Sequence, residues 1–211
     1  MQRWAAEDGT LWALEPGRGL PAACEARAPV AFAELPPAEV EALAAALSLD
    51  DLAPLRQRFA DGRRCFVMRA DGQIAAYGWV TRGAECVGEL ERRFHLHNDE
   101  AYIWDCATLP AWRGRRLYSA LLNQIARHIA GEDLARIWIG ASLQNRPSIR
   151  GIANAGFEHV LDLSYRRFHR LSAMWIRRVG AAPRPLLAAA YRILLQPHER
   201  RIGRLIVGYR S

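Results

Sequence analysis

The sequence lacks lysine entirely, so all 29 of its basic residues are arginine. With 22 acidic residues, the net charge is +7. Two interpretations of this bias stay open: a GC-rich coding sequence, or a positive field that attracts phosphates, acidic carriers or anionic membranes. No recognisable nucleic-acid-binding motif accompanies the charge, so we expect no nucleic-acid partner.

Several other signals are missing. The four cysteines form no C-x-x-C pair, and the run His95-Leu96-His97 has no identifiable third ligand, so we expect no metal site. No apolar run approaches bilayer length, and the N-terminus carries acids where a signal peptide needs an apolar core. These absences favour a protein of the reducing cytoplasm. At 211 residues and 51% hydrophobic, the chain predicts one sizeable core.

The hydrophobic pattern predicts a mixed sheet with helices on both sides, in the order β-α-α-β-β-β-α-β-α-β. An Asp71-Gly72 pair between two apolar runs indicates a hairpin. A further charged strand with a turn at Asn98-Asp99 precedes a central strand that we expect to be buried on both faces. The predicted strands are 25–35, 64–69, 73–81, 89–100, 101–109, 136–141 and 157–166, and the predicted helices are 36–47, 51–59, 117–130 and 147–155.

The stretch "TLPAWRGRRLYSALL", residues 108–122, joins a strand to a helix through an arginine-rich turn. Such a turn presents free backbone N–H groups and the positive end of the helix dipole, which suit a phosphate or pyrophosphate. Arg113, Arg115 and Arg116 add positive charge, and Gly114 lets the backbone approach an anion closely. The spacing is neither a P-loop nor a Rossmann fingerprint. Taken alone, arginines beside one glycine more often form a solvated turn than an anion site.

The same stretch resembles the V-x-P-x-[YW]-R-G-x-G-[IL]-G-x-x-L-L segment of the GNAT superfamily of acyl-coenzyme A-dependent N-acyltransferases. A strand "ARIWIGA" follows, and then "NRPSIRGIANAGF", which is similar to that family's N-x-x-[AS]…G-F segment. The resemblance covers roughly residues 36–168. It implies a GNAT-like α/β fold: a central, mostly antiparallel mixed sheet with helices on both faces and splayed central strands.

This resemblance implies acetyl-CoA, or another acyl-CoA, as co-substrate. Its pyrophosphate would lie on the backbone of residues 113–118, and its pantetheine arm would pair with the central strand in the gap that the splay leaves. Asn145 would reach the pantetheine or the departing sulfur with Ser148 close by, although both residues also suit a helix cap. The implied cofactor-binding residues are Cys106, Thr108, Arg113, Gly114, Arg115, Arg116, Leu117, Tyr118, Asn145 and Ser148.

The sequence departs from the family pattern at three positions. Arg116 stands where glycine is usual, and Tyr118 where glycine or alanine is usual. If both side chains point away from the cofactor, the backbone cradle survives; otherwise the site is occluded. Many members also place a general-acid tyrosine seven residues after the asparagine, and that position is Ile152. The proton for the leaving thiolate would then come from solvent, Tyr118 or Tyr165.

Acyl transfer to an amine requires an unprotonated nucleophile and therefore a nearby general base or water relay. Glu89, Glu91, His95 and His97 share one parity, so a regular strand would direct them to one face. That face is either a polar groove or a solvated edge that discourages aggregation. We rank Glu91 and Glu89 first as the base, Asp105 second and His97 third. Asp105 lies in an apolar run, where a carboxylate needs a partner, so the alternative is an ion pair with an arginine.

We divide the chain into an N-terminal arm (1–24) with one short strand near residues 10–14, a GNAT-like domain (25–170) and a basic amphipathic extension (171–211). The extension carries an apolar stripe at helical spacing, flanked by Arg184 and Arg192. This stripe packs on its own domain or on a second subunit of a homodimer, or else it meets an anionic membrane or an acidic acyl carrier protein.

The leading hypothesis is therefore an acetyl-CoA-dependent N-acyltransferase that transfers the acyl group directly to an amine in a ternary complex. The acceptor is an amine of a small molecule or of a protein. No cysteine lies in a context typical of an acyl-enzyme nucleophile. The alternatives are a non-catalytic acyl-CoA-binding or regulatory protein, and an acyltransferase supplied by an acyl carrier protein at a membrane surface.

Overall fold

The computed structural model describes residues 5–87, 90, 92–180 and 182–209. One ten-stranded sheet has the strand order β11-β12-β10-β9-β1-β8-β7-β4-β3-β2, and β5 and β6 form a separate hairpin. The strands are β1 (Ala5–Leu14), β2 (Ala31–Leu35), β3 (Arg64–Ala70), β4 (Gln73–Thr81), β5 (Ala84–Val87), β6 (Arg92–His95), β7 (Glu100–Thr108), β8 (Arg136–Ser142), β9 (Glu158–Phe168), β10 (Leu171–Arg178), β11 (Glu199–Ile202) and β12 (Leu205–Tyr209). The helices are α1 (Val40–Leu47), α2 (Ala53–Ala60), α3 (Leu117–Ile129), α4 (Arg146–Asn154) and α5 (Arg184–Leu194), with short 3₁₀ helices at Pro16–Arg18, Pro37–Glu39 and Pro110–Trp112.

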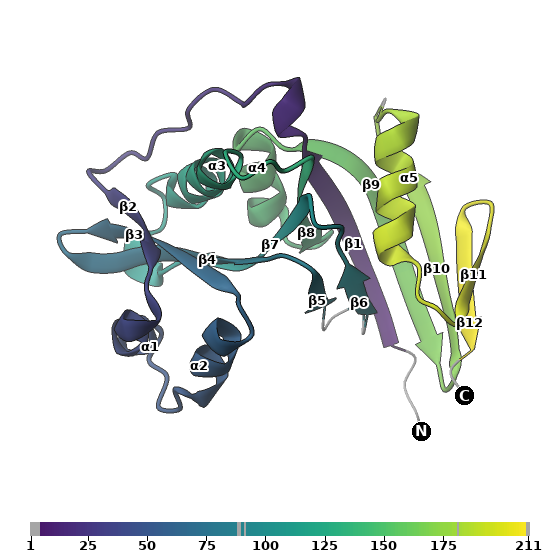
Figure 1. The fold of residues 1–211 in the computed structure, drawn as a ribbon, viewed down its shortest axis with the longest axis horizontal. Helices are drawn as coiled ribbons and strands as arrows, with labels where there is room; N and C mark the ends of the chain where they lie inside the picture. The colour runs from purple at the N-terminus through teal and green to yellow at the C-terminus, as the bar shows by residue number, and fades with distance from the viewer. Residues whose placement is uncertain (1–4, 88–89, 91, 181, 210–211) are drawn as a thin grey trace.

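Helices cover both faces of the sheet, as the sequence predicts. α3 and α4 lie together on one side, and α1 and α2 lie on the other (Figure 1). The alternating residues of β3 explain this division, because Phe66 and Met68 pack with α3 while Cys65 and Val67 pack with α1 and α2. The side chain of Trp104 packs against both the α1–α2 cluster and the cluster under α5, so α5 covers the same side as α1 and α2.

The central strands β7 and β8 separate partway along their length. They pair in parallel from Glu100 to Ile103 and from Arg136 to Ile139, yet β7 continues to Thr108 and β8 to Ser142. This confirms the splay that the family resemblance implies. The expectation that the central strand is buried on both faces is correct only for residues 100–103. Residues 104–108 are partly or fully exposed, because the neighbouring strand has moved away.

A β-bulge in β7 lies at the point where the strands part. Tyr77 pairs with Ala107 and Trp79 with Trp104, so the single residue Gly78 faces both Asp105 and Cys106. Asp105 adopts φ 42°, a left-handed conformation that costs a non-glycine residue free energy. Gly78 is required there, because a Cβ on it would lie 2.7 Å from the Cys106 Sγ.

The N-terminal segment is not the irregular arm that we expected. Residues 5–14 form β1, which pairs antiparallel with both β8 and β9 in the interior of the sheet. Sequence reasoning recovered only the end of this strand. Its partners lie more than 120 residues away in the chain, and a local pattern such as "AAEDG" does not encode such pairing.

The C-terminal segment is also part of the sheet. β10 pairs with β9 and β12, and β12 pairs with β11. The predicted amphipathic helix is present as α5, and most of its apolar stripe is buried: Leu186, Leu187, Ala190, Tyr191 and Leu194 are at most 5% exposed, whereas Leu195 is 38% exposed. The buried part of the stripe packs on the protein's own core, as the first alternative predicts. All three predicted parts of the chain contribute strands to one sheet, so the structure does not separate them.

The predicted strand over residues 89–100 is confirmed only in part. β6 covers only Arg92–His95, the turn at Asn98-Asp99 is present, and Glu100 already begins β7. His95 and His97 are exposed to solvent, whereas Phe94 points into the core. The two histidines of the predicted polar face are therefore in solvent, which matches the alternative that this segment forms a solvated edge. Glu89 and Glu91 lie outside the described residues.

Candidate active site

The arginine-rich turn has the backbone geometry of an anion site. Arg116 is the N-cap residue of α3 and adopts φ 63°, and Gly114 adopts φ 80°. Within the described chain, no side chain caps α3 and no acid stands in its first turn, so its N–H groups remain free to bind an anion. A Cβ on Gly114 would meet no described atom within 4 Å, so the backbone there is open.

The two unusual residues of the turn behave differently. Arg116 is exposed, and its left-handed backbone explains why glycine is common at this position. Tyr118 points inward instead, and its ring lies against Gly151 of α4. Burial raises the pKa of the Tyr118 phenol, whose hydroxyl hydrogen-bonds the Ser148 side chain. Of the two departures from the family pattern, only Tyr118 therefore changes the interior of the site.

A buried asparagine holds the chain before β2 against this turn. The Asn123 side chain accepts a hydrogen bond from the Cys24 N–H (3.2 Å) and donates to the Ala22 carbonyl (3.0 Å) and the Ala155 carbonyl (3.1 Å). The Arg27 N–H donates to the Arg115 carbonyl (2.8 Å). Because buried polar groups need partners, Asn123 ties this segment to α3 and α4. Sequence reasoning missed this residue, since an asparagine inside an apolar helix stripe was the only signal.

The second predicted motif forms the start of α4. The Asn145 Oδ1 accepts a hydrogen bond from the Ser148 N–H at 3.1 Å, which makes Asn145 the N-cap. The capping alternative is thus present in the structure. A role for these two residues toward coenzyme A stays a prediction. Because Ser148 also contacts Tyr118, the beginnings of α3 and α4 are joined by side-chain contacts.

A cavity of about 710 Å³ lies beside the parted strands. Strands β1, β7 and β8, the β5–β6 segment and one residue of α2 all contribute to its wall. Its lining residues are Glu7, Asp8, Gly9, Thr10, Leu11, Arg58, Glu85, Cys86, Val87, Leu90, Phe94, Tyr102, Trp104, Asp105, Gly140, Ala141, Ser142 and Leu163. The size lies within the range for small-molecule sites, and the lining combines aromatic and aliphatic side chains with several carboxylates.

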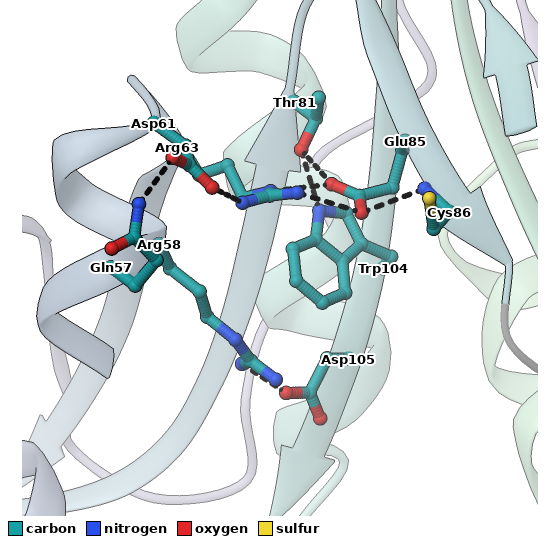
Figure 2. A network of polar contacts seen from close by, with 9 residues as sticks. All are labelled: Gln57, Arg58, Asp61, Arg63, Thr81, Glu85, Cys86, Trp104 and Asp105. Carbon is teal, nitrogen blue, oxygen red and sulfur yellow. Dashed lines mark hydrogen bonds and ion pairs between the residues drawn. The ribbon is translucent and has the colours of Figure 1, made fainter. Parts of the chain in front are cut away.

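Asp105, predicted as a possible base, is held by an arginine. The Arg58 Nη1 lies 2.5 Å from the Asp105 Oδ2, and the Tyr77 hydroxyl donates to the Oδ1 at 3.2 Å. The Arg58 guanidinium also stacks over Trp104, 4.6 Å from the ring centroid (Figure 2). The ion-pair alternative for Asp105 is therefore the one that the structure supports.

Glu85 is the most completely bound carboxylate of the cavity wall. It receives two hydrogen bonds from Arg63 (2.7 and 3.2 Å), one from the Thr81 hydroxyl (2.6 Å) and one from the Cys86 N–H (2.9 Å). Thr81 in turn accepts from the Trp104 Nε1 at 2.8 Å, as Figure 2 shows. This network fixes Trp104 and the cavity wall. It leaves Glu85 poorly suited to act as a base.

Glu7 is a cavity residue that sequence reasoning missed, because its strand was taken for an arm. It is half-buried, and among the described residues it enters no ion pair. Its neighbour Asp8 differs, since hydrogen bonds from Arg166 and Ser164 lower the pKa of that carboxyl. Asp8, Glu85 and Asp105 are therefore each paired with an arginine, and among the lining carboxylates that the structure describes, Glu7 is the one without an ion pair.

Cys106 lies on the opposite face of β7 from Asp105, next to Gly78 and Ile125. Burial raises the pKa of the Cys106 thiol, and its Sγ–H donates to the Trp104 carbonyl at 3.2 Å. A thiol in this state is a poor nucleophile. Thr108 is half-buried at the end of β7, where its carbonyl accepts from the Arg113 Nε at 3.4 Å.

Among the described residues, no three His, Cys, Asp or Glu side chains converge as a metal site would need. In the part of the chain that the structure describes, no helix has both the length and the apolar character to cross a bilayer.

The structure resembles several solved acetyltransferases. One from Sphaerobacter thermophilus has a TM-score of 0.57 at 14% identity and covers 84% of this chain and 54% of its own. One from Novosphingobium aromaticivorans has 0.52 at 17% identity, with 84% and 66% covered, and one from Colwellia psychrerythraea has 0.51 at 16% identity, with 75% and 54% covered. This chain thus spans about half to two thirds of their length. At these identities the likeness concerns the fold.

No curated protein is similar to the sequence at a significant level. The sequence model described as the acetyltransferase (GNAT) family, however, matches residues 20–157, which is more than half of the chain. The matched range contains the splayed strands, the free N-terminus of α3 and the Asn145 cap. The chain therefore belongs to the GNAT acetyltransferase family.

Proposed function

We propose that this protein is an acyl-CoA-dependent N-acyltransferase that uses acetyl-CoA and transfers the acyl group directly to an amine. One observation carries the proposal. The parting of β7 and β8 leaves the open N-terminus of α3 on one face of the sheet and a cavity on the other. A donor held on the first face and an acceptor held in the cavity would meet at the bulge in β7.

The residues of the donor side fit coenzyme A. The open backbone of residues 113–118 would hold the pyrophosphate, and the arginines around it would add positive charge. Backbone groups of β7 near Cys106 and Thr108, which lack a β8 partner, would pair with the pantetheine arm. Asn145 and Ser148 would lie near its end. When bound, acetyl-CoA supplies an activated acyl group as a thioester.

The acceptor side fits a small amine. A cavity of about 710 Å³ is suited to a small molecule better than to a folded protein surface. We propose Glu7 as the group that takes the proton from the amine, because the other described carboxylates of the wall are bound by arginines. The earlier candidates Glu89 and Glu91 remain the competing assignment, since Val87 and Leu90 beside them line the same cavity.

Thiol release from acetyl-CoA across a panel of small amines tests the activity. We expect release with at least one amine. The variants Glu7→Gln, Glu89→Gln and Glu91→Gln then test the base, because its loss lowers turnover more at low pH than at high pH, where free amine is already present. Full activity of Glu7→Gln across the pH range would remove Glu7 from the mechanism. If peptide mass spectrometry after incubation with acetyl-CoA alone shows an acetylated Cys86, the transfer proceeds through an acyl-enzyme and is not direct.

Donor binding is tested separately by thermal unfolding with CoA, which must raise the melting temperature if it binds the native state. Gly114→Asp adds bulk and negative charge to the open turn and should abolish the shift. Gly203→Asp is the matched control, because Gly203 also has positive φ (62°) and open surroundings but lies in the β11–β12 turn. An equal shift in both variants would contradict the proposed cradle.

A non-catalytic acyl-CoA-binding protein is the second candidate. The observation that favours it is Ile152, a fully buried aliphatic residue at the position where many family members place the proton-donating tyrosine. In that case CoA should stabilise the protein while no amine in the panel releases thiol. The two experiments together therefore distinguish a binding protein from an enzyme.

A further inference from the structure

Acyl transfer leaves a thiolate that must gain a proton, and Ile152 has none to give. It is 0% exposed and packs in the core with Leu117 and Leu121. Tyr165, the other tyrosine that the sequence suggested, belongs to the separate core cluster under α5. A donor hydroxyl must therefore come from elsewhere in the site.

Tyr118 and Gly151 form a matched pair across the α3–α4 contact. A Cβ on Gly151 would lie 2.3 Å from the Tyr118 Cδ1 and 2.8 Å from its Cε1. Any other residue at position 151 would therefore displace the ring. Because Gly151 has no side chain, the Tyr118 ring packs directly against the backbone of α4. The conformation of Tyr118 is thus fixed by packing, as a positioned catalytic group requires.

The hydroxyl of Tyr118 lies at the boundary between α4 and β7. It hydrogen-bonds the Ser148 side chain and interacts electrostatically with the Cys106 thiol on the open half of β7. The position of Ser148 is itself fixed by the Asn145 cap. The phenol carries its proton at neutral pH; burial raises the pKa of Tyr118, which weakens it as an acid, and the hydrogen bond with Ser148 lowers the pKa in the direction that favours proton donation. These contacts place a proton donor beside the strand segment assigned to the end of the pantetheine arm.

We propose that Tyr118 protonates the departing thiolate, and that Gly151 and Ser148 position it for this step. The proposal rests on the proposed function. The amine nitrogen forms a bond to the acyl carbon, the carbon–sulfur bond breaks, and its electron pair passes to sulfur. Sulfur takes the Tyr118 proton. The proton lost by the amine goes to the base, and solvent exchange returns one to the tyrosinate, so charge and protons balance.

Kinetics of Tyr118→Phe test the step directly. The variant keeps the ring on Gly151 and loses only the hydroxyl. We expect kcat to fall about 100-fold, the lower end of general-acid effects, with an unchanged KM for acetyl-CoA. Tyr165→Phe is the matched control and should keep wild-type kcat. Gly151→Ala, which displaces the ring, should also lower kcat. Wild-type kcat in Tyr118→Phe would overturn the proposal.

A binding experiment needs no acceptor. CoA and desulfo-CoA differ only at the thiol, so their affinities should diverge above a pH of about 8.5, where the thiol ionises and accepts a stronger hydrogen bond from Tyr118. In Tyr118→Phe the advantage of CoA should shrink about tenfold. Equal preference for CoA in both proteins would overturn the proposal.

Occlusion is the opposite outcome. If the ring blocks the pantetheine path, Tyr118→Ala should bind CoA more tightly than the wild type, and this would overturn the proposal. Failure of the proposed function looks different, because wild-type protein would then release no thiol with any amine. Loss of activity in Tyr118→Phe with intact CoA binding supports the inference, whereas a wild-type protein that neither binds CoA nor releases thiol contradicts the proposed function first.

Discussion

Residues 20–157, which match the family model, differ sharply from the segments that flank them. The matched region carries the turn, the Asn145 cap and the splayed strands. The flanking segments 5–14 and 158–209 carry no recognised motif, yet they build β1 and β9–β12 of the same sheet. The recognised motifs therefore lie in one region of the chain, whereas the strands of the sheet come from the whole chain.

The two regions are joined by contacts that cross the sheet. β1 lies between β8 of the matched region and β9 of the flanking one, and Trp12 stacks on His159 at 4.2 Å. The β5–β6 hairpin reaches the C-terminal strands through Arg92 and Glu199. The cavity draws Glu7 from β1 and Leu163 from β9, so the flanking segments supply part of the candidate active site.

The largest expected effect comes from removing the C-terminal region. A chain ending at Arg170 loses β10, α5, β11 and β12 and uncovers buried residues such as Val160 and Leu163. Each fully buried apolar side chain contributes about 1.5–3 kcal/mol, and a domain is stable by only about 5–15 kcal/mol in total. We expect no cooperative thermal transition by circular dichroism. If the truncated protein melts cooperatively and binds CoA, the C-terminal region is an appendage that the rest of the fold does not need.

The buried ion pair between Arg92 and Glu199 should have the next largest effect. Both side chains are 2% exposed, and the Nη1–Oε2 distance is 2.5 Å. Glu199→Ala leaves a buried charge without its partner, so the free energy of unfolding should fall by about 3–5 kcal/mol in urea denaturation. Replacing both residues by methionine should recover most of that loss. If the single and double variants are equally unstable, the pair does not link the hairpin to β11.

Glu100 should give a smaller, pH-dependent effect. Burial alone would raise the pKa of this carboxyl, but hydrogen bonds from the His97 N–H and from Arg192 and Arg136 outweigh it and lower the pKa below 4.5. Its stabilisation is therefore fully present above pH 4.5 and lost as pH falls through the folded-state pKa. We expect Glu100→Gln to cost about 1–3 kcal/mol near pH 7. If the wild type remains more stable than Glu100→Gln by the same free energy of unfolding at lower pH, this assignment is contradicted.

Much of the matched region could be predicted because its signals are local. The Asp71-Gly72 hairpin, the start of α3 and the Asn145 cap each depend on a few adjacent residues. The amphipathic helix α5 was predictable for the same reason. The part of the protein that its apolar stripe packs against was not predictable. The pattern of alternating charges around β6 was misleading, because it spans a loop and a turn rather than one strand.

The cavity wall could not be predicted, because it depends on pairing between distant segments. Glu7 enters the site only through the insertion of β1 beside β8, and Asp105 acquires Arg58 only through the packing of α2 on β7. Gly151 gave no signal either, since its role appears only when the Tyr118 ring is placed against it.

The sequence by itself determined the family, the order of the central elements and the strand–turn–helix geometry of the arginine-rich turn, because short-range backbone preferences and a spaced motif encode them. Only the tertiary structure decided which carboxylates are free, which face of α5 is covered and where Tyr118 points. These properties depend on side chains brought together by long-range strand pairing and close packing. No short stretch of the sequence encodes either the long-range pairing or the packing.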